Sequence, residues 1–334
     1  MIFSKKIKAA ALCAAAIMSF GIQSGCGSEK AADNGGDKQY KVGVVQLVEH
    51  NALDAANKGF IDGLKERGFE EGKNLVVDQQ NAQADQSNLQ NIAQRFVNDK
   101  DDLIYAIATP AAQTVANITK DIPIVASAIT DYEGAKLVKS NNEPGGNLTG
   151  TSDMNPIKEQ IDLMLKLVPN AKTIGCIYTS SEANSEIQFK AMKEYAESKG
   201  LKVESATISN VNDIQQAAQS LVGKVDVFWE PTDNVIASAI PTLVSVTDPA
   251  KKAVICGEPN LVKNGGLATY GIDYYELGKQ SGHMAADILE GKSKPANMPI
   301  QFAKVLKAMF NKTDAAKLGI TLSDDLTKDA DMVE

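Results

Sequence analysis

The fold is decided by one stretch of the chain, TIGCIYTSSEANS, at residues 173–185. Its first half is a short apolar run, and its second half consists mainly of hydroxyl, amide and acidic side chains. An amphipathic run begins near Glu186. This order predicts a buried strand, a tight polar loop and then the start of a helix. A helix start offers unpaired backbone N–H groups and a partial positive charge, so it suits a carboxylate or another anion.

The same pattern recurs at residues 42–51, 102–112, 124–131 and 225–234. In parallel α/β sheets, the loops that follow the strands open onto one crevice, where small ligands bind. The strands fall into two series, with a Gly-rich turn and a helix at 157–167 before the second. The predicted strands are 41–48, 75–78, 102–107 and 123–128 in the first series, and 173–178, 202–206, 225–229, 253–256 and 267–270 in the second.

We therefore predict an α/β fold of two doubly wound, flavodoxin-like parallel-sheet lobes, with a ligand cleft between them. A chain of 334 residues is also long enough for two domains of about 100–200 residues. A helix at 277–289 fits the first lobe, because the second has used five strands by then. The predicted hinge has three strands, which cross near 150–154, 271–274 and 300–304. Lobe 1 is predicted at 40–152 plus about 274–299, and lobe 2 at 153–273 plus about 300–334.

Residues 1–25 are predicted to be a lipoprotein signal peptide. Three lysines precede an apolar run at residues 9–20, which is shorter than the roughly 20 residues of a membrane-spanning helix. The run ends in IQSGC, which resembles a bacterial lipobox and makes Cys26 the predicted lipidation site. Gln23 stands where such boxes usually have Leu, and a plain secretory signal is the alternative.

Residues 26–39 are polar and contain glycine, so they predict a flexible linker. We expect a globular body that is secreted across the cytoplasmic membrane and tethered there by lipid.

Composition excludes several partners and chemistries. The formal net charge is −8, and the signal peptide carries three lysines and no acid, so the remaining body is more acidic still. Nucleic acid binding requires clustered Lys and Arg, so no nucleic acid partner is expected. Cys176 and Cys256 are expected in buried strands separated by a third, too far apart for a disulfide. With no second Cys or His at ligand spacing, no metal site and no cofactor are predicted.

A set of motifs resembles a known family. The motifs are ALDAA at 52–56, IATPAAQ at 107–113, PGGNLTG at 144–150, SSEANS at 180–185, PTDN at 231–234 and GIDYY at 271–275. Residues 40–320 thereby resemble the type I periplasmic-binding-protein fold. More narrowly, they resemble the ABC-transporter substrate-binding lipoproteins whose characterised members are associated with tryptophan and other aromatic amino acids. His50-Asn51 departs from the His-Pro common in the family, and Glu258 from the Asp common there.

The resemblance implies that the protein captures a small molecule outside the cytoplasm and delivers it to an ABC permease and its ATPase. An aromatic or branched amino acid is the expected ligand, and a monomer is the expected state. A sugar or nucleoside in the same fold is the first alternative, although the lack of cleft arginines argues against it. A sensory ligand-binding module is the second. A DNA-binding repressor is excluded by the secretion signal.

An amino acid needs donors for its carboxylate, a carboxylate for its ammonium and a slot for its side chain. The ammonium candidates are Asp131, Asp153, Asp233, Glu258 and Asp273. We favour Asp273, with a helix cap as the alternative role. The slot candidates are His50, Tyr132, Trp229 and Tyr274, with core packing as the alternative for Trp229.

Carboxylate donors are expected from helix-start N–H groups and loop hydroxyls, each of which can instead cap its own helix. The predicted ligand-binding residues are His50, Thr109, Ala111, Ala112, Thr130, Asp131, Asp153, Ser180, Ser181, Asn184, Ser185, Thr232, Asp233, Asn234, Glu258 and Asp273. No catalytic residue is predicted, because the chain has no Gly-x-Ser-x-Gly elbow, no phosphate loop and no His pair for zinc. We therefore expect a binding protein and not an enzyme.

Overall fold

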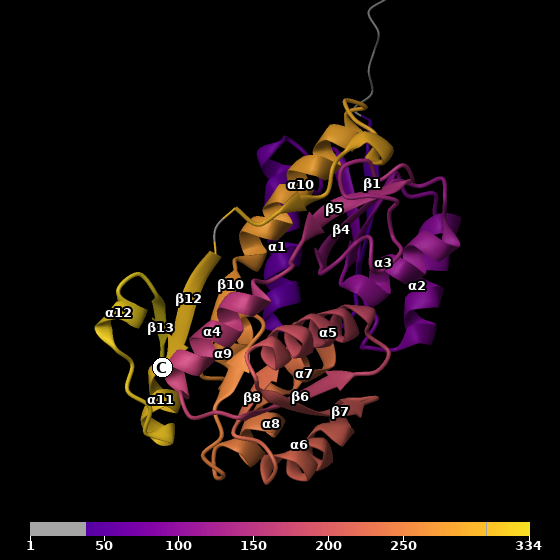
Figure 1. Cartoon of the computed structure of the whole chain (residues 1–334). Helices are drawn as coiled ribbons and strands as arrows, with labels where there is room; N and C mark the ends of the chain where they lie inside the picture. The colour runs from indigo at the N-terminus through magenta and orange to yellow at the C-terminus, as the bar shows by residue number, and fades with distance from the viewer. Residues whose placement is uncertain (1–37, 305) are drawn as a thin grey trace, which may run out of the picture. The chain divides into compact units, whose positions relative to one another are not determined.

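The structure is a computed structural model that describes residues 38–304 and 306–334 (Figure 1). The predicted signal peptide, the lipidation site Cys26 and the linker up to residue 37 lie outside the described residues. Within them, helices alternate with strands that form two mostly parallel sheets. The predicted α/β fold of two doubly wound lobes is confirmed.

The first sheet is entirely parallel and has the strand order β11-β5-β4-β3-β1-β2. Helices α1 and α10 contact one face of it, and α2 and α3 contact the other. Because helices cover both faces, every residue of β3 and β4 is buried, as expected for a sheet of this kind. The strands are β1 (Tyr40–Gln46), β2 (Leu75–Asn81), β3 (Leu103–Ile107), β4 (Ile124–Ile129), β5 (Leu148–Ser152) and β11 (Gln301–Phe302). The helices are α1 (Asn51–Glu66), α2 (Gln86–Asn98), α3 (Thr109–Ile118) and α10 (Tyr274–Leu289).

The second sheet has the order β13-β12-β10-β9-β8-β6-β7, in which only the β10–β12 pair is antiparallel. Helices α4 and α5 contact one face, and α6 and α9 contact the other. The strands are β6 (Thr173–Thr179), β7 (Lys202–Ile208), β8 (Val227–Glu230), β9 (Val254–Cys256), β10 (Ala268–Ile272), β12 (Leu306–Asn311) and β13 (Asp331–Val333). The helices are α4 (Ile157–Leu167), α5 (Ala183–Ser198), α6 (Ile214–Val222), α7 (Asn234–Ser238), α8 (Ile240–Thr247), α9 (Pro259–Lys263), α11 (Lys312–Leu318) and α12 (Asp324–Thr327).

The cysteine prediction is confirmed. Cys176 in β6 and Cys256 in β9 are buried free thiols, and β8 lies between their strands.

The C-terminal strand prediction is wrong in detail. In place of the single hinge strand predicted near 300–304, the chain forms β11, which pairs with β5 of the first sheet, and β12, which pairs with β10 of the second. An apolar run gives no sign of which sheet its neighbours belong to, so the split could not be seen in the sequence.

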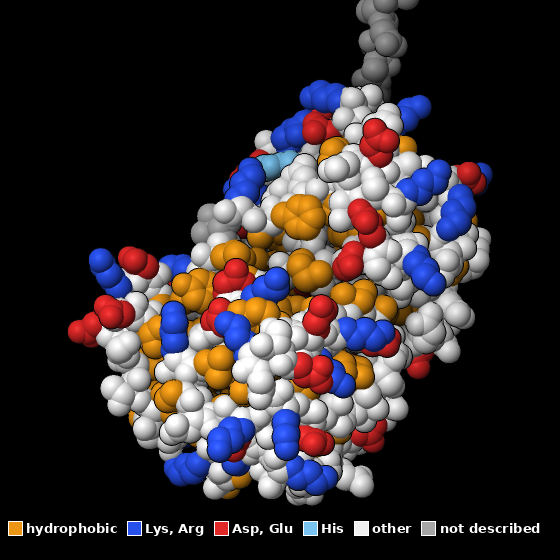
Figure 2. Space-filling model, in the orientation of Figure 1, with side chains coloured by type: hydrophobic (Ala, Val, Ile, Leu, Met, Phe, Trp, Pro, Cys, Tyr) orange, Lys and Arg blue, Asp and Glu red, His pale blue; other side chains and the backbone are white. Residues whose placement is uncertain are grey.

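The crossing segments between the two sheets leave apolar surface uncovered. Met154, Tyr270, Phe302 and Leu306 are exposed, and all four lie at or next to the strands where the chain passes between the sheets. Hydrophobic side chains show in the middle of the face drawn in Figure 2, and charges of both signs are mixed around them.

Candidate ligand-binding site

A small cleft lies where strand ends of the two sheets face each other. Its lining comes from both sheets and consists of His50, Ala52, Leu53, Ala128, Asp153, Thr232, Asp233, Asn234, Ala237, Glu258 and Tyr274. The cavity measures about 10 Å³, which is room for about one water molecule. The cleft is therefore nearly closed in this arrangement.

Polar side-chain contacts join the two halves of the molecule across the cleft. The His50 Nε2 atom lies 3.2 Å from the Asn234 Oδ1 atom, and the Thr130 and Thr232 hydroxyl oxygens lie 3.4 Å apart. Gln188 also donates its Nε2–H to both threonine hydroxyls. His50, Thr130 and Thr232 follow β1, β4 and β8, so the ends of three strands come together here.

Asp153 has a buried carboxyl group, and only one of its two oxygens accepts a hydrogen bond from another side chain. The Tyr274 hydroxyl donates to Asp153 Oδ2 at 2.7 Å. The other oxygen, Oδ1, is buried and has no hydrogen-bond partner among the described residues. Burial raises the pKa of Asp153 to about 6, because a charge is costly in a poorly solvated site. This carboxyl can take one more donor from within the cleft.

Glu258 is the second acid that lines the cleft. It caps α9 by accepting from the Asn260 and Leu261 backbone N–H groups at 2.6 and 2.8 Å. Burial raises its pKa to about 7. Both oxygens have partners, so Glu258 has less capacity for a new donor than Asp153.

Glu182 is a functional candidate that the sequence interpretation missed. It accepts hydrogen bonds from the side-chain amides of Asn184 and Asn234, and from the backbone N–H groups of Asn234 and Val235. Burial and the neighbouring Asp233 raise the pKa of Glu182 to about 8. A glutamate in the loop before a helix is favourable on dipole grounds alone, so its position in the sequence gave no signal of this network.

Asp233 and Ser185 serve the fold of the second sheet. Asp233 accepts four hydrogen bonds, from the Thr179 N–H and hydroxyl, the Ser185 hydroxyl and the Ile236 N–H. Its carboxylate therefore has no accepting position to spare. Although Asp233 lines the cleft, its oxygens already accept four hydrogen bonds from the protein and leave no position for a ligand donor.

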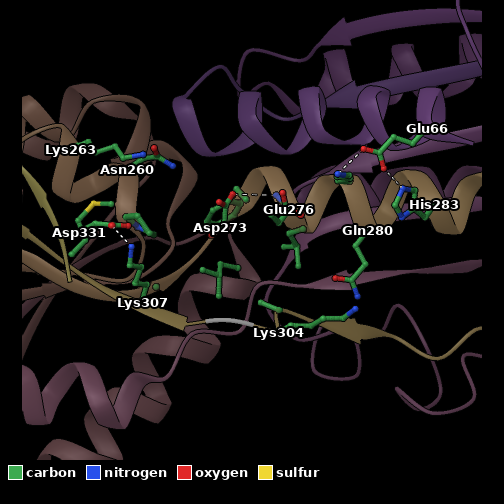
Figure 3. Close-up of a pocket in the computed structure, with 18 residues that line it drawn as sticks. Glu66, Asn260, Lys263, Asp273, Glu276, Gln280, His283, Lys304, Lys307 and Asp331 are labelled. Atoms are coloured by element: carbon green, nitrogen blue, oxygen red, sulfur yellow. Dashed lines mark hydrogen bonds and ion pairs between the residues drawn. The ribbon is translucent and has the colours of Figure 1, made fainter. Parts of the chain in front are cut away.

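Asp273 lies apart from the cleft. It is exposed and caps α10, accepting from the Tyr275 and Glu276 N–H groups at 2.9 and 3.2 Å. It lines a different cavity of about 690 Å³ beside the hinge strands (Figure 3). The structure thus gives Asp273 the capping role that was the alternative in the sequence interpretation.

The basic groups of this larger cavity are mostly paired with acids. Lys279 and His283 both contact Glu66, and Lys307 contacts Asp331 (Figure 3). Of the predicted ligand-binding residues, Asp273 alone lines this cavity. We therefore place the candidate site in the smaller cleft.

Several other predicted residues do not line the cleft. Asp131 accepts from the Gly134 N–H in a turn. Ser180 and Ser181 are exposed, and Ser181 borders a separate groove beside α2 and α3. Asn184 is buried on the Glu182 side of the cleft.

At the start of α3, the Thr109 hydroxyl does not take the alternative role of capping its own helix. The cap position is Ala108, which has a φ of +85°, and Thr109 is the first helical residue. The Thr109 hydroxyl is buried without a partner among the described residues. The Ala112 N–H donates to the Ala108 carbonyl and is therefore occupied, while Ala111 lies beside it in the same turn.

Backbone strain marks two strand ends of the first sheet. Ala108 follows β3 and Ala128 lies near the end of β4, and both have positive φ angles, +85° and +57°. Residues with a Cβ rarely adopt this conformation, and it concentrates at functional sites. Ala128 lines the cleft.

Of the aromatic slot candidates, His50 and Tyr274 line the cleft. Trp229 is fully buried and donates its indole N–H to Gln160, and Tyr132 is buried with its hydroxyl on backbone carbonyls. Both are core residues. Burial lowers the pKa of His50, so its imidazole is neutral at pH 7.

The described part of the chain holds no group of three or more His, Cys, Asp or Glu side chains arranged to bind a metal ion. None of its helices combines the length and apolar character needed to cross a membrane.

Comparison with known proteins identifies the family of the chain. Residues 41–334 match the family model described as ABC transporter substrate binding protein. A protein of Clostridioides difficile named tyrosine-binding protein is 45% identical over 300 residues, which cover 88% of this chain and 86% of that protein.

Two solved structures show similar folds. The ABC domain of Streptococcus pneumoniae in complex with L-Trp has 42% identity and a TM-score of 0.86, covering 89% of this chain and all of that one. The ligand-free, open structure of a Clostridium difficile substrate-binding protein with adhesive properties has 41% identity but a TM-score of 0.68, covering 88% of this chain and 99% of that one. At nearly equal identity, our structure is closer to the ligand complex than to the open form. The resemblance seen in the sequence is confirmed, and the chain belongs to the family of ABC transporter substrate-binding proteins.

Proposed function

We propose that this protein is an extracytoplasmic lipoprotein that binds an aromatic amino acid in the cleft and delivers it to an ABC permease. The observation that carries the proposal is Asp153. Its carboxyl is buried in a cleft lined from both sheets, and one of its oxygens lacks a partner among the described residues. The named ligands of the two relatives above, tyrosine and L-Trp, both carry an ammonium group that such a carboxylate would bind.

Asp153 is our choice for the ammonium partner, in place of Asp273. An ammonium held at Oδ1 would replace lost hydration with a charge-assisted hydrogen bond. Tyr274, which already donates to Oδ2, would hold the carboxylate in place. For the ligand carboxylate we propose the first turn of α3, where the buried Thr109 hydroxyl and the helix start lie after β3, because such turns favour anions.

The cleft is lined by residues that follow strands of both sheets, and this lining suggests how a ligand is captured. Since the closed cavity holds about one water molecule, the sheets must separate to admit an amino acid. A ligand that contacts both sides favours the closed state by its differential affinity. The permease would then recognise the closed form, and the predicted signal peptide with Cys26 would tether the protein to the membrane.

Isothermal titration calorimetry tests this proposal. L-Tyr and L-Trp are expected to bind the purified protein, and D153N is expected to weaken binding at least 30-fold, roughly the lower limit for removing one partner of a buried charge pair. D273N is the matched control, because Asn also caps helices, and it should bind like wild type. Absence of binding by every aromatic amino acid would refute the ligand, and equal losses in both variants would refute the role of Asp153.

A further inference from the structure

A chain of three side chains fixes the tautomer of His50. Asn234 donates its Nδ2–H to Glu182 Oε2 at 2.5 Å, so its Oδ1 atom is the one that faces His50. Glu182 Oε2 also accepts from the Asn184 side-chain amide and from the Asn234 backbone N–H, whereas Oε1 accepts only from the Val235 N–H at 3.3 Å. A proton on this carboxyl, whose pKa is raised to about 8, is therefore accommodated on Oε1 and leaves Oε2 an acceptor. A flipped Asn234 amide would place its oxygen against this carboxyl and its NH₂ against the ring.

An oxygen can only accept a hydrogen bond, so the His50 nitrogen that faces Asn234 must carry the proton. That nitrogen is Nε2, at 3.2 Å. In a neutral imidazole the other nitrogen, Nδ1, is then an acceptor. Nδ1 is buried and has no hydrogen-bond partner among the described residues.

A buried acceptor in a ligand cleft is normally hydrogen-bonded, so His50 Nδ1 needs a donor from the ligand. His50 lines the cleft beside Ala52 and Leu53, which are apolar and supply no side-chain donor. The ammonium site proposed above, Asp153, also lines the cleft and is a separate residue with its own unpaired oxygen. The ligand therefore meets two acceptors of different kinds.

We propose that His50 Nδ1 selects ligands whose aromatic side chain carries a hydrogen-bond donor, either a phenol O–H or an indole N–H, over those without one. His50 is then a specificity-determining residue, and Asn234 and Glu182 are positioning residues that hold its tautomer. This inference rests on the proposed function, since it concerns the side-chain end of the same amino acid ligand. The His50–Asn234 contact joins the two sheets, so the tautomer is set when the cleft closes.

Pairs of ligands that differ by one donor test the selection. L-Tyr is compared with L-Phe, and L-Trp with 1-methyl-L-tryptophan, by calorimetry on the purified protein. The donor-bearing member of each pair is expected to bind at least about 10-fold more tightly. Phe is smaller than Tyr, and 1-methyltryptophan is larger than Trp, so a loss in both pairs cannot come from size alone. Affinities equal within about 2-fold in either pair would overturn the inference and leave the proposed function standing, whereas no binding by any of the four would overturn both.

His50→Phe keeps a flat ring and removes the acceptor. Its affinity for L-Tyr is expected to fall about 10-fold or more, while L-Phe binds within about 3-fold of wild type. The retained L-Phe binding shows that the variant is folded. His283→Gln is the matched control, because His283 contacts Glu66 away from the cleft, and it should keep the preference. A His50→Phe variant that still prefers Tyr over Phe would contradict the assignment.

The positioning role has a spectroscopic readout. The chain has only two histidines, so ¹H–¹⁵N correlation spectra of the ring nitrogens, with His283→Gln for assignment, identify the His50 tautomer directly. We expect protonated Nε2 and unprotonated Nδ1 at pH 7 in the ligand-bound protein. Asn234→Leu should lose this single-tautomer signature and reduce the Tyr/Phe preference to within about 3-fold, and Glu182→Gln, which keeps an acceptor for Asn234, should retain both. A protonated Nδ1 in wild type would overturn the proposal.

Discussion

At the scale of single residues, the cleft and the side chains behind it include three acids whose pKa values lie above their usual range. Asp153, Glu258 and Glu182 have pKa values raised to about 6, 7 and 8, mainly by burial. A carboxyl with a raised pKa in the folded state binds more protons there than in the unfolded chain. Folded stability therefore falls as pH rises through the window between the unfolded and folded pKa values. For each of the three acids, burial is the largest cause of the raised pKa.

The D153N substitution should remove part of this pH dependence of folded stability. The pKa of Asp153 rises from 3.8 to about 6, so the ligand-free wild type is expected to lose about 2 kcal/mol from this group between pH 4 and pH 7. D153N lacks that loss, while Glu258 and Glu182 contribute alike in both proteins. Chemical denaturation of both proteins at pH 4, 5, 6 and 7 measures the difference. Parallel stability curves would show that Asp153 does not titrate in this window.

At the scale of elements, helices α1 and α10 pack with their backbones unusually close. Gly59 and Gly63 in α1 and Gly278 and Gly282 in α10 have no room for a Cβ, because backbone atoms of the opposite helix occupy the space. This interface joins a helix near the start of the described chain to one that follows β10 of the second sheet. It also sets the position of Tyr274, at the start of α10, next to Asp153.

Gly278→Ala should therefore destabilise the protein. The new Cβ would meet the Ala56 carbonyl of α1, and forcing the helices apart is expected to lower the free energy of unfolding by about 1–3 kcal/mol or more. Gly223→Ala is the control, because Gly223 has a negative φ and open space around it, and should change stability by less than about 0.5 kcal/mol. Thermal and chemical denaturation measure both. Equal stability of the two variants would mean that the helices can separate at no cost.

At the scale of the whole described body, the structure is in a closed arrangement. The side-chain contacts between Thr130 and Thr232, and between His50 and Asn234, bridge the cleft. The TM-scores of 0.86 to a complex with L-Trp and 0.68 to an open, ligand-free relative point the same way.

Small-angle scattering should show the protein close on its ligand. A few hydrogen bonds of about 1 kcal/mol each hold the ligand-free form only weakly, so an open population is expected in solution. Saturating L-Trp should lower the radius of gyration, because the ligand bridges both sides and shifts the population to the closed form. D153N at the same ligand concentration should respond less. A scattering profile that L-Trp leaves unchanged would contradict hinge closure.

Much of the fold was predictable because it depends on local pattern. The apolar runs that form β1 and β6 are mostly buried, and such runs predict strands of a covered sheet. Helix α4 begins and ends at the predicted residues, 157 and 167. The order of strands and helices then leaves few topologies. The C-terminal elements were harder, because β11 and β12 lie on different sheets despite being close in sequence.

The sequence by itself determined the α/β alternation, the two-sheet architecture and the family, because periodicity and motif order are properties of neighbouring residues. Only the tertiary structure decided which acids face the cleft. Asp153 and Asp273 both follow strands, yet one is buried against Tyr274 and the other caps α10 in solvent. Burial and hydrogen bonding depend on groups more than 100 residues away, such as Tyr274 for Asp153 and Asn234 for His50, and no local pattern encodes those encounters.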